Sequence, residues 1–316
     1  RARTLHRMET LALVTAIAAT GHDDDLVALL DACADAGLHA RAVAWDDPTV
    51  SWARFDAVLL RSPWDYTERL PEFLAWCEHT SRATQLLNPL PVIRWNTDKH
   101  YLEDLAAAGV AVVPTRFVEP DAEPLEALQG FLAACATGEF VVKPAISAGS
   151  RDTQRYARDQ EFAASNHIAR LLEQNRSVML QPYLRSVDSV GETALIYFNG
   201  QFSHAIRKDA LLRADELATA TPYASGPITA SQAQPDQHEL AERTLQAVER
   251  LLRLDQPLAY ARVDLVRDDE GGPRLLELEL TEPSLFFEQA TGSAERFAAA
   301  LGQRLLASSI DPGCKQ

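Results

Sequence analysis

Two segments near the end of the chain alternate apolar and charged residues with the period of a β-strand. They read ARVDL over residues 261–265 and LELEL over residues 276–280. Successive side chains of a strand point to opposite faces, so the charged residues of each segment share one face. These residues are Arg262, Asp264, Glu277 and Glu279. Each strand would therefore present two charged groups on one side of a sheet.

The two segments lie close enough in the sequence to form a hairpin. A turn centred on Glu270-Gly271 would pair Asp264 with Glu277 and Arg262 with Glu279. Closely spaced carboxylates repel one another unless a cation joins them, and such oxygen ligands suit Mg²⁺. The hairpin therefore predicts a magnesium site. The alternative is an amphipathic hairpin whose charged face is only solvated.

The positions of the lysines favour a binding site over a charged face that is only solvated. The chain has 30 basic residues, but lysine occurs only as Lys99, Lys143, Lys208 and Lys315. Lys99 follows Asn96-Thr97-Asp98 at a predicted helix start, and Lys143 ends the apolar run 140–142. The small-residue loop 144–150 follows and could bring backbone N–H groups to an anion. Because lysine supplies a compact ammonium group, these two positions predict phosphate binding.

Composition excludes several classes of protein. The chain has 316 residues, which suggests two or three domains, and its net charge is −15. This negative excess disfavours nucleic-acid and membrane-surface partners. The widely spaced cysteines Cys33, Cys77, Cys135 and Cys314 predict neither disulfides nor a zinc site. We expect the apolar run 11–20 to be a buried strand rather than a signal peptide, and the protein to be cytoplasmic.

Strand-like and helix-like segments alternate along the chain, which predicts an α/β fold beginning with a small parallel sheet. The expected strands are residues 11–18, 40–45, 57–60, 86–87, 110–113, 140–143, 178–181, 193–198, 202–206, 259–266 and 275–280. The expected helices are 25–36, 71–79, 98–108, 125–136, 161–174, 239–252 and 294–306, and 214–237 is a polar stretch. Asn199-Gly200 predicts a tight hairpin turn.

Several motifs occur in a fixed order. They are NTDK at 96–99, VVKP at 141–144 with its loop, LQPYL at 180–184, RVD at 262–264, ELE at 277–279 and TEP at 281–283. With these motifs the chain resembles ATP-grasp ligases of the glutathione synthetase and RimK-like branch. With RSPWDY at 61–66 it also resembles the cyclo-ligases that act on O-ureido-D-serine in D-cycloserine biosynthesis.

The resemblance implies a three-part ATP-grasp fold. A parallel-sheet domain would span residues 1–97, a central subdomain with the phosphate loop 98–183, and a C-terminal subdomain with the metal site 184–316. ATP and two Mg²⁺ ions would be the cofactors. The residues implied to bind ATP are Lys99, Lys143, Ser147, Gly149, Ser150, Gln181, Tyr183, Leu184 and Glu192, with Asp188 as an alternative to Glu192 for the ribose.

The resemblance also assigns roles within the hairpin. Asp264, Glu277 and Glu279 would hold the metal ions. Arg262 would stabilise the charge on the transferring phosphoryl group and the tetrahedral intermediate, and Lys143, which would hold phosphate with Lys99, is the second residue assigned to catalysis. The family usually has Asn where Glu279 stands. The extra negative charge would either tighten metal binding or pair Glu279 with Arg262.

Substrate-binding candidates follow the strand at 57–60, at the edge where α/β sheets usually bind ligands. They are Arg61, Trp64, Asp65 and Tyr66, with Arg207 and Lys208 after the Asn199-Gly200 hairpin. For Trp64 and Tyr66, packing at a domain interface is an equal alternative.

The implied reaction activates a small amino-acid carboxylate as an acyl phosphate for attack by an amine, with ring closure of O-ureido-D-serine as the leading case. A RimK-like ligase acting on a peptide or protein, and a non-catalytic nucleotide-binding module, are the alternatives. Since α/β domains of this size often associate, a homodimer or homotetramer is a further expectation.

Overall fold

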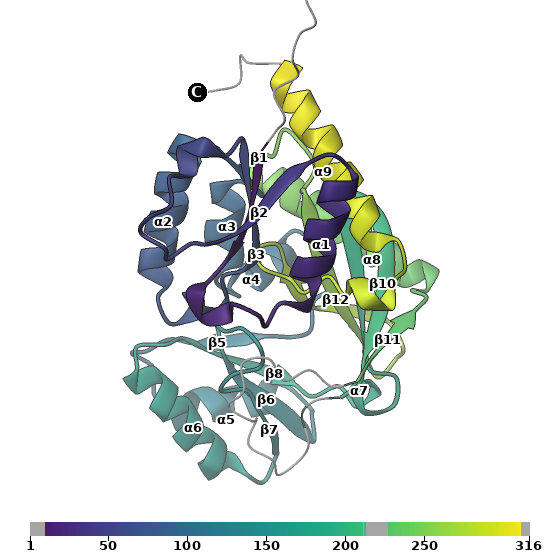
Figure 1. Cartoon of the computed structure of the whole chain (residues 1–316). Helices are drawn as coiled ribbons and strands as arrows, with labels where there is room; N and C mark the ends of the chain where they lie inside the picture. Colours follow the sequence, from purple (N-terminus) through teal and green to yellow (C-terminus); the bar gives the residue numbers. More distant parts are fainter. Residues whose placement is uncertain (1–9, 211, 213–226, 311–316) are drawn as a thin grey trace, which may run out of the picture.

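The computed structural model describes residues 10–210, 212 and 227–310, and the described residues form three sheets with helices packed around them (Figure 1). The mixed α/β architecture agrees with the prediction. None of the helices in this part of the chain combines the length and the apolar character that a membrane span requires.

The N-terminal sheet is parallel and has the strand order β2-β1-β3-β4. Its elements are β1 (Thr10–Thr15), η1 (Ile17–Ala19), α1 (Asp24–Asp35), β2 (His39–Ala44), η2 (Trp52–Arg54), β3 (Ala57–Ser62), η3 (Trp64–Thr67), α2 (Leu70–Ala83), β4 (Gln85–Leu87) and α3 (Leu90–Asn96). Leu29 of α1 packs with Leu11 and Leu59, whereas Phe73 of α2 packs with Val58 on the other face. Helices on both faces explain why β1 and β3 are almost continuously apolar.

The second sheet has the order β5-β8-β6-β7 and is antiparallel. Its region contains α4 (Tyr101–Ala107), β5 (Arg116–Val118), α5 (Pro124–Ala134), β6 (Glu139–Pro144), β7 (Gln154–Ala157), α6 (Glu161–Glu173) and β8 (Val178–Pro182). Phe131 of α5 and Ile168 of α6 pack with Phe140 of β6. The strand predicted over Val110–Val113 is wrong, because this segment forms only one bridge, from Val112 to Leu275.

The third sheet is antiparallel and has the order β11-β10-β9-β12-β13. The elements are α7 (Ser186–Ser189), β9 (Glu192–Phe198), β10 (Gln201–Lys208), β11 (Ile228–Ser231), α8 (Pro235–Leu252), β12 (Tyr260–Arg267), β13 (Pro273–Glu279), η4 (Phe287–Gln289) and α9 (Ser293–Ile310). The predicted turn joins β9 and β10, and Asn199 and Gly200 both have positive φ, of 52° and 76°. Of the predicted polar stretch, 214–226 lies outside the described residues.

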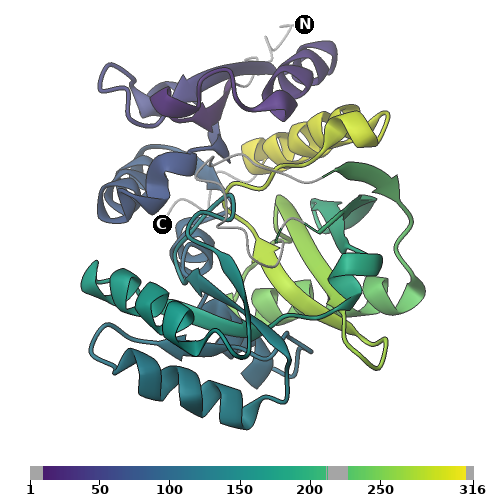
Figure 2. The same cartoon turned by 90° about the horizontal axis from the view of Figure 1, so that it is seen from below.

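A single hydrophobic cluster joins the first and third sheets. Leu11 and Leu29 pack in it with Ile196 of β9, Phe198 of β9 and Phe297 of α9. Figure 2 shows α9, in yellow, between the N-terminal elements and the third sheet. The three sheets follow the order of the three predicted parts, and the boundaries at 97 and 183 stay predictions.

Cys33 and Cys77 are buried and free, and Cys135 is free and half-buried, as expected for reduced thiols. Burial raises the pKa of Cys33 to about 11. Cys314 lies outside the described residues.

Candidate active site

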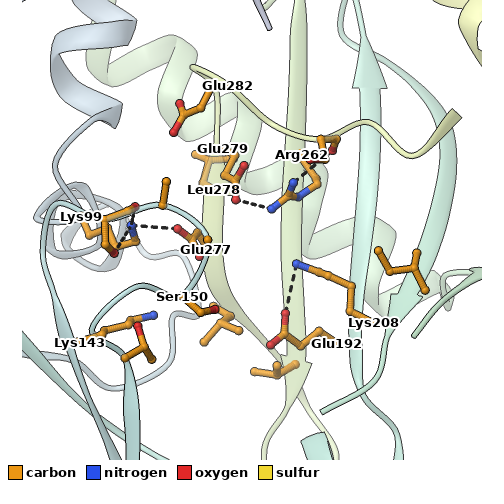
Figure 3. A pocket seen from close by; sticks show the side chains of 18 of the residues that line it. Lys99, Lys143, Ser150, Glu192, Lys208, Arg262, Glu277, Leu278, Glu279 and Glu282 are labelled. Carbon is orange, nitrogen blue, oxygen red and sulfur yellow. Dashed lines mark hydrogen bonds and ion pairs between the residues drawn. The ribbon is translucent and has the colours of Figure 1, made fainter. Parts of the chain in front are cut away.

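A pocket of about 460 Å³ is lined by residues of the second and third sheets together with residues at the start of α1 and in η3 (Figure 3). This volume lies in the usual range for small-molecule sites. The predicted residues that line it are Trp64, Tyr66, Lys99, Lys143, Ser147, Gly149, Ser150, Gln181, Tyr183, Leu184, Glu192, Lys208, Arg262, Glu277 and Glu279. Most of the predicted site is therefore brought together in one place.

The charged hairpin has the predicted pairing. Arg262 lies opposite Glu279, and Asp264 lies opposite Glu277. A β-bulge follows directly, since Leu265 pairs with Leu275. The bulge changes the register by one residue between the turn and the charged pairs, and it keeps the four charged side chains on a common face.

The three carboxylates of the hairpin can reach a common ion. Oxygen atoms of Asp264, Glu277 and Glu279 all lie within 4.8 Å of one another. Arg262 donates hydrogen bonds of 2.9 Å to each oxygen of Asp264 and also binds Glu279. Lys208 lies 2.6 Å from Asp264. Hard oxygen ligands in this number fit Mg²⁺, and the neighbouring cations offset the rest of their charge.

Burial and the neighbouring charged side chains shift the pKa values of the three carboxylates. Burial would raise the pKa of Asp264, but Arg262 and Lys208 hold it at about 2. Burial likewise opposes ionisation of Glu277, yet Lys99 and Lys143 lower its pKa. Burial and the neighbouring carboxylates raise the pKa of Glu279 against the attraction of Arg262. Asp264 and Glu277 are thus the carboxylates best held in the ionised form.

The two predicted phosphate lysines lie in different surroundings. Lys99 donates a 2.8 Å hydrogen bond to the Ser147 carbonyl, and its Nζ lies 3.1 Å from Glu277. Lys143 is buried at the end of β6 and makes no hydrogen bond or ion pair with any described residue. Burial lowers the pKa of Lys143. Its side chain lines the pocket without an ion pair to any described residue, so this end of the pocket is suited to an anion.

The loop between β6 and β7 has backbone angles that favour glycine. Gly149, Ser150 and Asp152 have φ values of 63°, 59° and 54°. Successive turns of this kind can aim N–H groups at a phosphate. The loop also reaches the N-terminal domain, because Arg151 forms an ion pair with Glu68, just after η3.

The segment after β8 leads from the second sheet to the third. Gln181 donates a 2.8 Å hydrogen bond to the Thr115 hydroxyl. Tyr183 donates one of 2.6 Å to Asp188, and the Arg155 guanidinium lies 3.6 Å from the centre of the Tyr183 ring. Asp188 is bound by Tyr183 and Arg155 and does not line the pocket, whereas Glu192 lines it. Glu192 is therefore the better placed of the two ribose candidates.

Three predicted substrate residues lie outside the pocket wall. Arg61 is buried and donates a 3.0 Å hydrogen bond to the Pro283 carbonyl. Asp65 accepts hydrogen bonds from Trp45 and Arg69. Arg207 pairs with Asp209 at 2.9 Å. These contacts hold neighbouring segments in place, so the substrate candidates that remain at the pocket are Trp64, Tyr66 and Lys208.

Two further residues fix the position of β13. Asn96 donates a 2.7 Å hydrogen bond to the Leu278 carbonyl and accepts one of 2.7 Å from the Leu280 N–H. The Leu278 N–H donates to the Tyr101 hydroxyl at 2.9 Å. Asn96 belongs to the NTDK motif, but its sequence position alone does not reveal a partner 182 residues away.

Glu282 was not predicted as a site residue. It is buried, lines the pocket and interacts with the Tyr66 hydroxyl. Burial and the charge of Glu279 raise the pKa of Glu282 to about 8. Glu282 belongs to the TEP motif at 281–283, but its sequence position alone does not reveal that it lies at the pocket near Tyr66.

Comparisons with known proteins agree with this geometry. Residues 11–88 match the family described as D-cycloserine synthetase DcsG, N-terminal domain. The chain is 47% identical to the cycloserine biosynthesis protein DcsG of Streptomyces lavendulae, over 94% of this chain and 99% of that protein. The crystal structure of D-cycloserine synthetase DcsG matches with a TM-score of 0.89 at 46% identity, over 94% of this chain and 99% of that one.

More distant structures share the fold. The ATP-grasp ligase PsnB, complexed with its minimal precursor, gives a TM-score of 0.65 at 19% identity over 94% of this chain and all of PsnB. D-alanine–D-alanine ligase from Bacillus anthracis gives 0.65 at 13% identity, over 97% of this chain and all of that one. The resemblance to ATP-grasp ligases is confirmed, and this chain belongs to the D-cycloserine synthetase DcsG family.

Proposed function

We propose that this protein is an ATP-dependent cyclo-ligase that closes O-ureido-D-serine to D-cycloserine. The observation that carries the proposal is the buried, unpartnered Lys143 in the same pocket as the carboxylates of the hairpin and Arg262. Phosphoryl transfer needs positioned cations and metal ligands more than a protein nucleophile. The close similarity to the DcsG protein supports the choice of substrate.

The residues of the pocket fit ATP and Mg²⁺. Lys143, Lys99 and the loop at Ser147–Thr153 would hold the phosphates, and Gln181 to Leu184 with Glu192 would hold the nucleoside. Asp264, Glu277 and Glu279 would hold two Mg²⁺ ions. Bound ATP would supply the phosphoryl group that turns the substrate carboxylate into an acyl phosphate.

The remaining steps use the protein to orient one small molecule. Arg262 would stabilise negative charge on the reacting carboxyl group. The aminooxy nitrogen would form a bond to the carboxyl carbon as inorganic phosphate leaves that carbon. Water would take the carbamoyl group from the nitrogen, giving carbamate that breaks down to CO2 and ammonia. Holding both ends of one molecule gives the proximity advantage of an intramolecular reaction. A pocket of about 460 Å³ suits such a substrate better than a polypeptide.

The decisive experiment measures Mg²⁺-dependent ADP release with O-ureido-D-serine and detects D-cycloserine as the product. O-ureido-L-serine and D-alanine serve as comparison substrates. The absence of ADP formation with every amino-acid-like carboxylate would contradict the proposal. Since the reaction consumes ATP, we place it in the cytoplasm.

A further inference from the structure

The acidic side chains of the pocket differ in how their charge is balanced. Glu277 lies 3.1 Å from Lys99, Glu192 lies 3.3 Å from Lys208, and Glu279 binds Arg262. Glu282 forms no ion pair with a cationic side chain in the described part of the chain. A buried carboxylate without a cation is unfavourable, so the position of Glu282 calls for an explanation.

A second buried acid in the pocket, Asp23, has a different role. Its side chain accepts a 3.1 Å hydrogen bond from the Asp25 N–H at the start of α1. The N-terminus of this twelve-residue helix offsets its negative charge. Glu282 lies in no helix, and its carboxylate has no comparable compensation.

Two residues of η3 contact Glu282. The Tyr66 hydroxyl interacts with its carboxylate, and the Trp64 indole N–H donates a 3.2 Å hydrogen bond to its carbonyl oxygen. Both partners come from η3 of the N-terminal domain. Figure 3 shows Glu282 beyond Glu279, at the end of the pocket opposite Lys143. The pocket thus has a carboxyl group without an ion pair at one end and a lysine without one at the other, among the described residues.

We infer that the carboxylate of Glu282, held by Tyr66, binds the α-ammonium group of the substrate and so selects amino acids over other carboxylic acids. The inference rests on the proposed function and adds a recognition residue to it. An ammonium group placed at Glu282 leaves the substrate's carboxyl group free to face Arg262 and the carboxylate cluster. Glu282 is not among the three carboxylates that can reach a common ion, so it is better suited to an ammonium group than to that metal site.

The test removes each half of the proposed ion pair in turn. Substrate affinity is measured for wild type and Glu282→Gln, with O-ureido-D-serine and with 3-(ureidooxy)propanoate, which lacks only the α-amino group. Calorimetry in the presence of a non-hydrolysable ATP analogue reports binding, and ADP release reports KM and kcat. Wild type should lose about 10- to 100-fold in affinity when the amino group is removed. E282Q should discriminate between the two ligands by less than about threefold.

Matched variants exclude a general disturbance of the pocket. Glu288→Gln removes the charge of an exposed glutamate at the pocket rim and should retain the discrimination of wild type. Tyr66→Phe should weaken the discrimination in part. ATP affinity should stay unchanged in E282Q, which shows that the variant is folded.

Two outcomes would overturn the inference: an E282Q variant that still prefers the amino acid as strongly as wild type, or one that loses both ligands equally. Failure of the proposed function looks different, because wild type itself would then release no ADP with O-ureido-D-serine.

Discussion

Glu279 lies directly across the hairpin from Arg262, and its carboxylate binds the guanidinium group that also holds Asp264. This arrangement bears on the extra negative charge at position 279, where related ligases usually have Asn. Arg262 balances that charge, while an oxygen of Glu279 stays within reach of the other two carboxylates. Glu279 therefore belongs both to the ion pair with Arg262 and to the proposed metal site.

Arg262→Ala should lower kcat by about 100- to 1000-fold, because one preorganised donor for developing charge is lost. ATP affinity should change by less than about threefold, since Arg262 lies among the carboxylates rather than at the lysines. ADP release and nucleotide binding check the two quantities. Arg250→Ala, on the exposed face of α8, is the control. Retained turnover in R262A would refute the assigned role.

Lys143→Met should raise the dissociation constant of ATP by at least about tenfold, because it removes a charge that would pair with phosphate. The ligand-free variant should melt at no lower temperature than wild type, since the lost ammonium group is buried without a partner. Calorimetry and thermal melts measure both effects. Lys143→Arg keeps the charge and should bind ATP more tightly than K143M. Equal binding in both variants would argue against a charge contact.

Glu277→Gln should raise the Mg²⁺ concentration for half-maximal ADP release by more than about tenfold. Glu279→Gln should have a smaller effect, because the charge of Glu279 is already engaged by Arg262. Titration of each variant with Mg²⁺ gives the comparison, and chelation of the metal should stop ADP release altogether. If Glu279→Gln raised the required Mg²⁺ concentration more than Glu277→Gln did, Glu279 would be the principal metal ligand.

His167 should make folding sensitive to acid. Burial lowers its pKa to about 4, and its Nδ1 lies 3.0 Å from the Tyr156 hydroxyl. The unfolded chain takes up the proton near pH 6.5, so this stabilisation is complete above that pH and is lost as the pH falls towards 4.

The loss between pH 8 and pH 5 should be about 2 kcal/mol in the free energy of unfolding. His167→Asn keeps a hydrogen-bonding group for Tyr156 but cannot be protonated, and it should lose correspondingly less over this interval. Urea unfolding at the two pH values measures the difference. An unchanged pH dependence in H167N would exclude His167 as its source.

The sequence predicted those strands and helices whose hydrophobic pattern is strong over a short stretch of the chain. The apolar runs of β1 and β6 and the amphipathic α1 were all expected. The error at Val110–Val113 arose because an apolar run does not reveal its partner. That segment pairs with Leu275, more than 160 residues away. The Val113 N–H donates a 2.9 Å hydrogen bond to the Leu275 carbonyl, and the Leu275 N–H donates one of 2.8 Å to the Ala111 carbonyl.

The charged pairs of the hairpin were predicted correctly, but the turn was not fully described. Near the turn Arg267 pairs with Pro273. Continued without a bulge, that register would place Asp264 opposite Leu276 instead of Glu277. The alternation of apolar and charged residues identified the charged face of the hairpin. The β-bulge that keeps the charged residues of both strands on this face has no recognisable sequence pattern.

The cluster shared by the first and third sheets, and the hydrogen bonds that cross it, limit how this enzyme can be re-engineered. Asn88 donates 2.9 Å hydrogen bonds to the carbonyls of Tyr260 and Leu280, and Asn96 holds the strand that carries Glu277 and Glu279. The N-terminal region up to Asn96 consequently cannot be exchanged as an independent unit. In a chimera that received this region from another ligase, the strand carrying the proposed metal ligands would be displaced, and a new substrate range is better sought by changing side chains within the pocket.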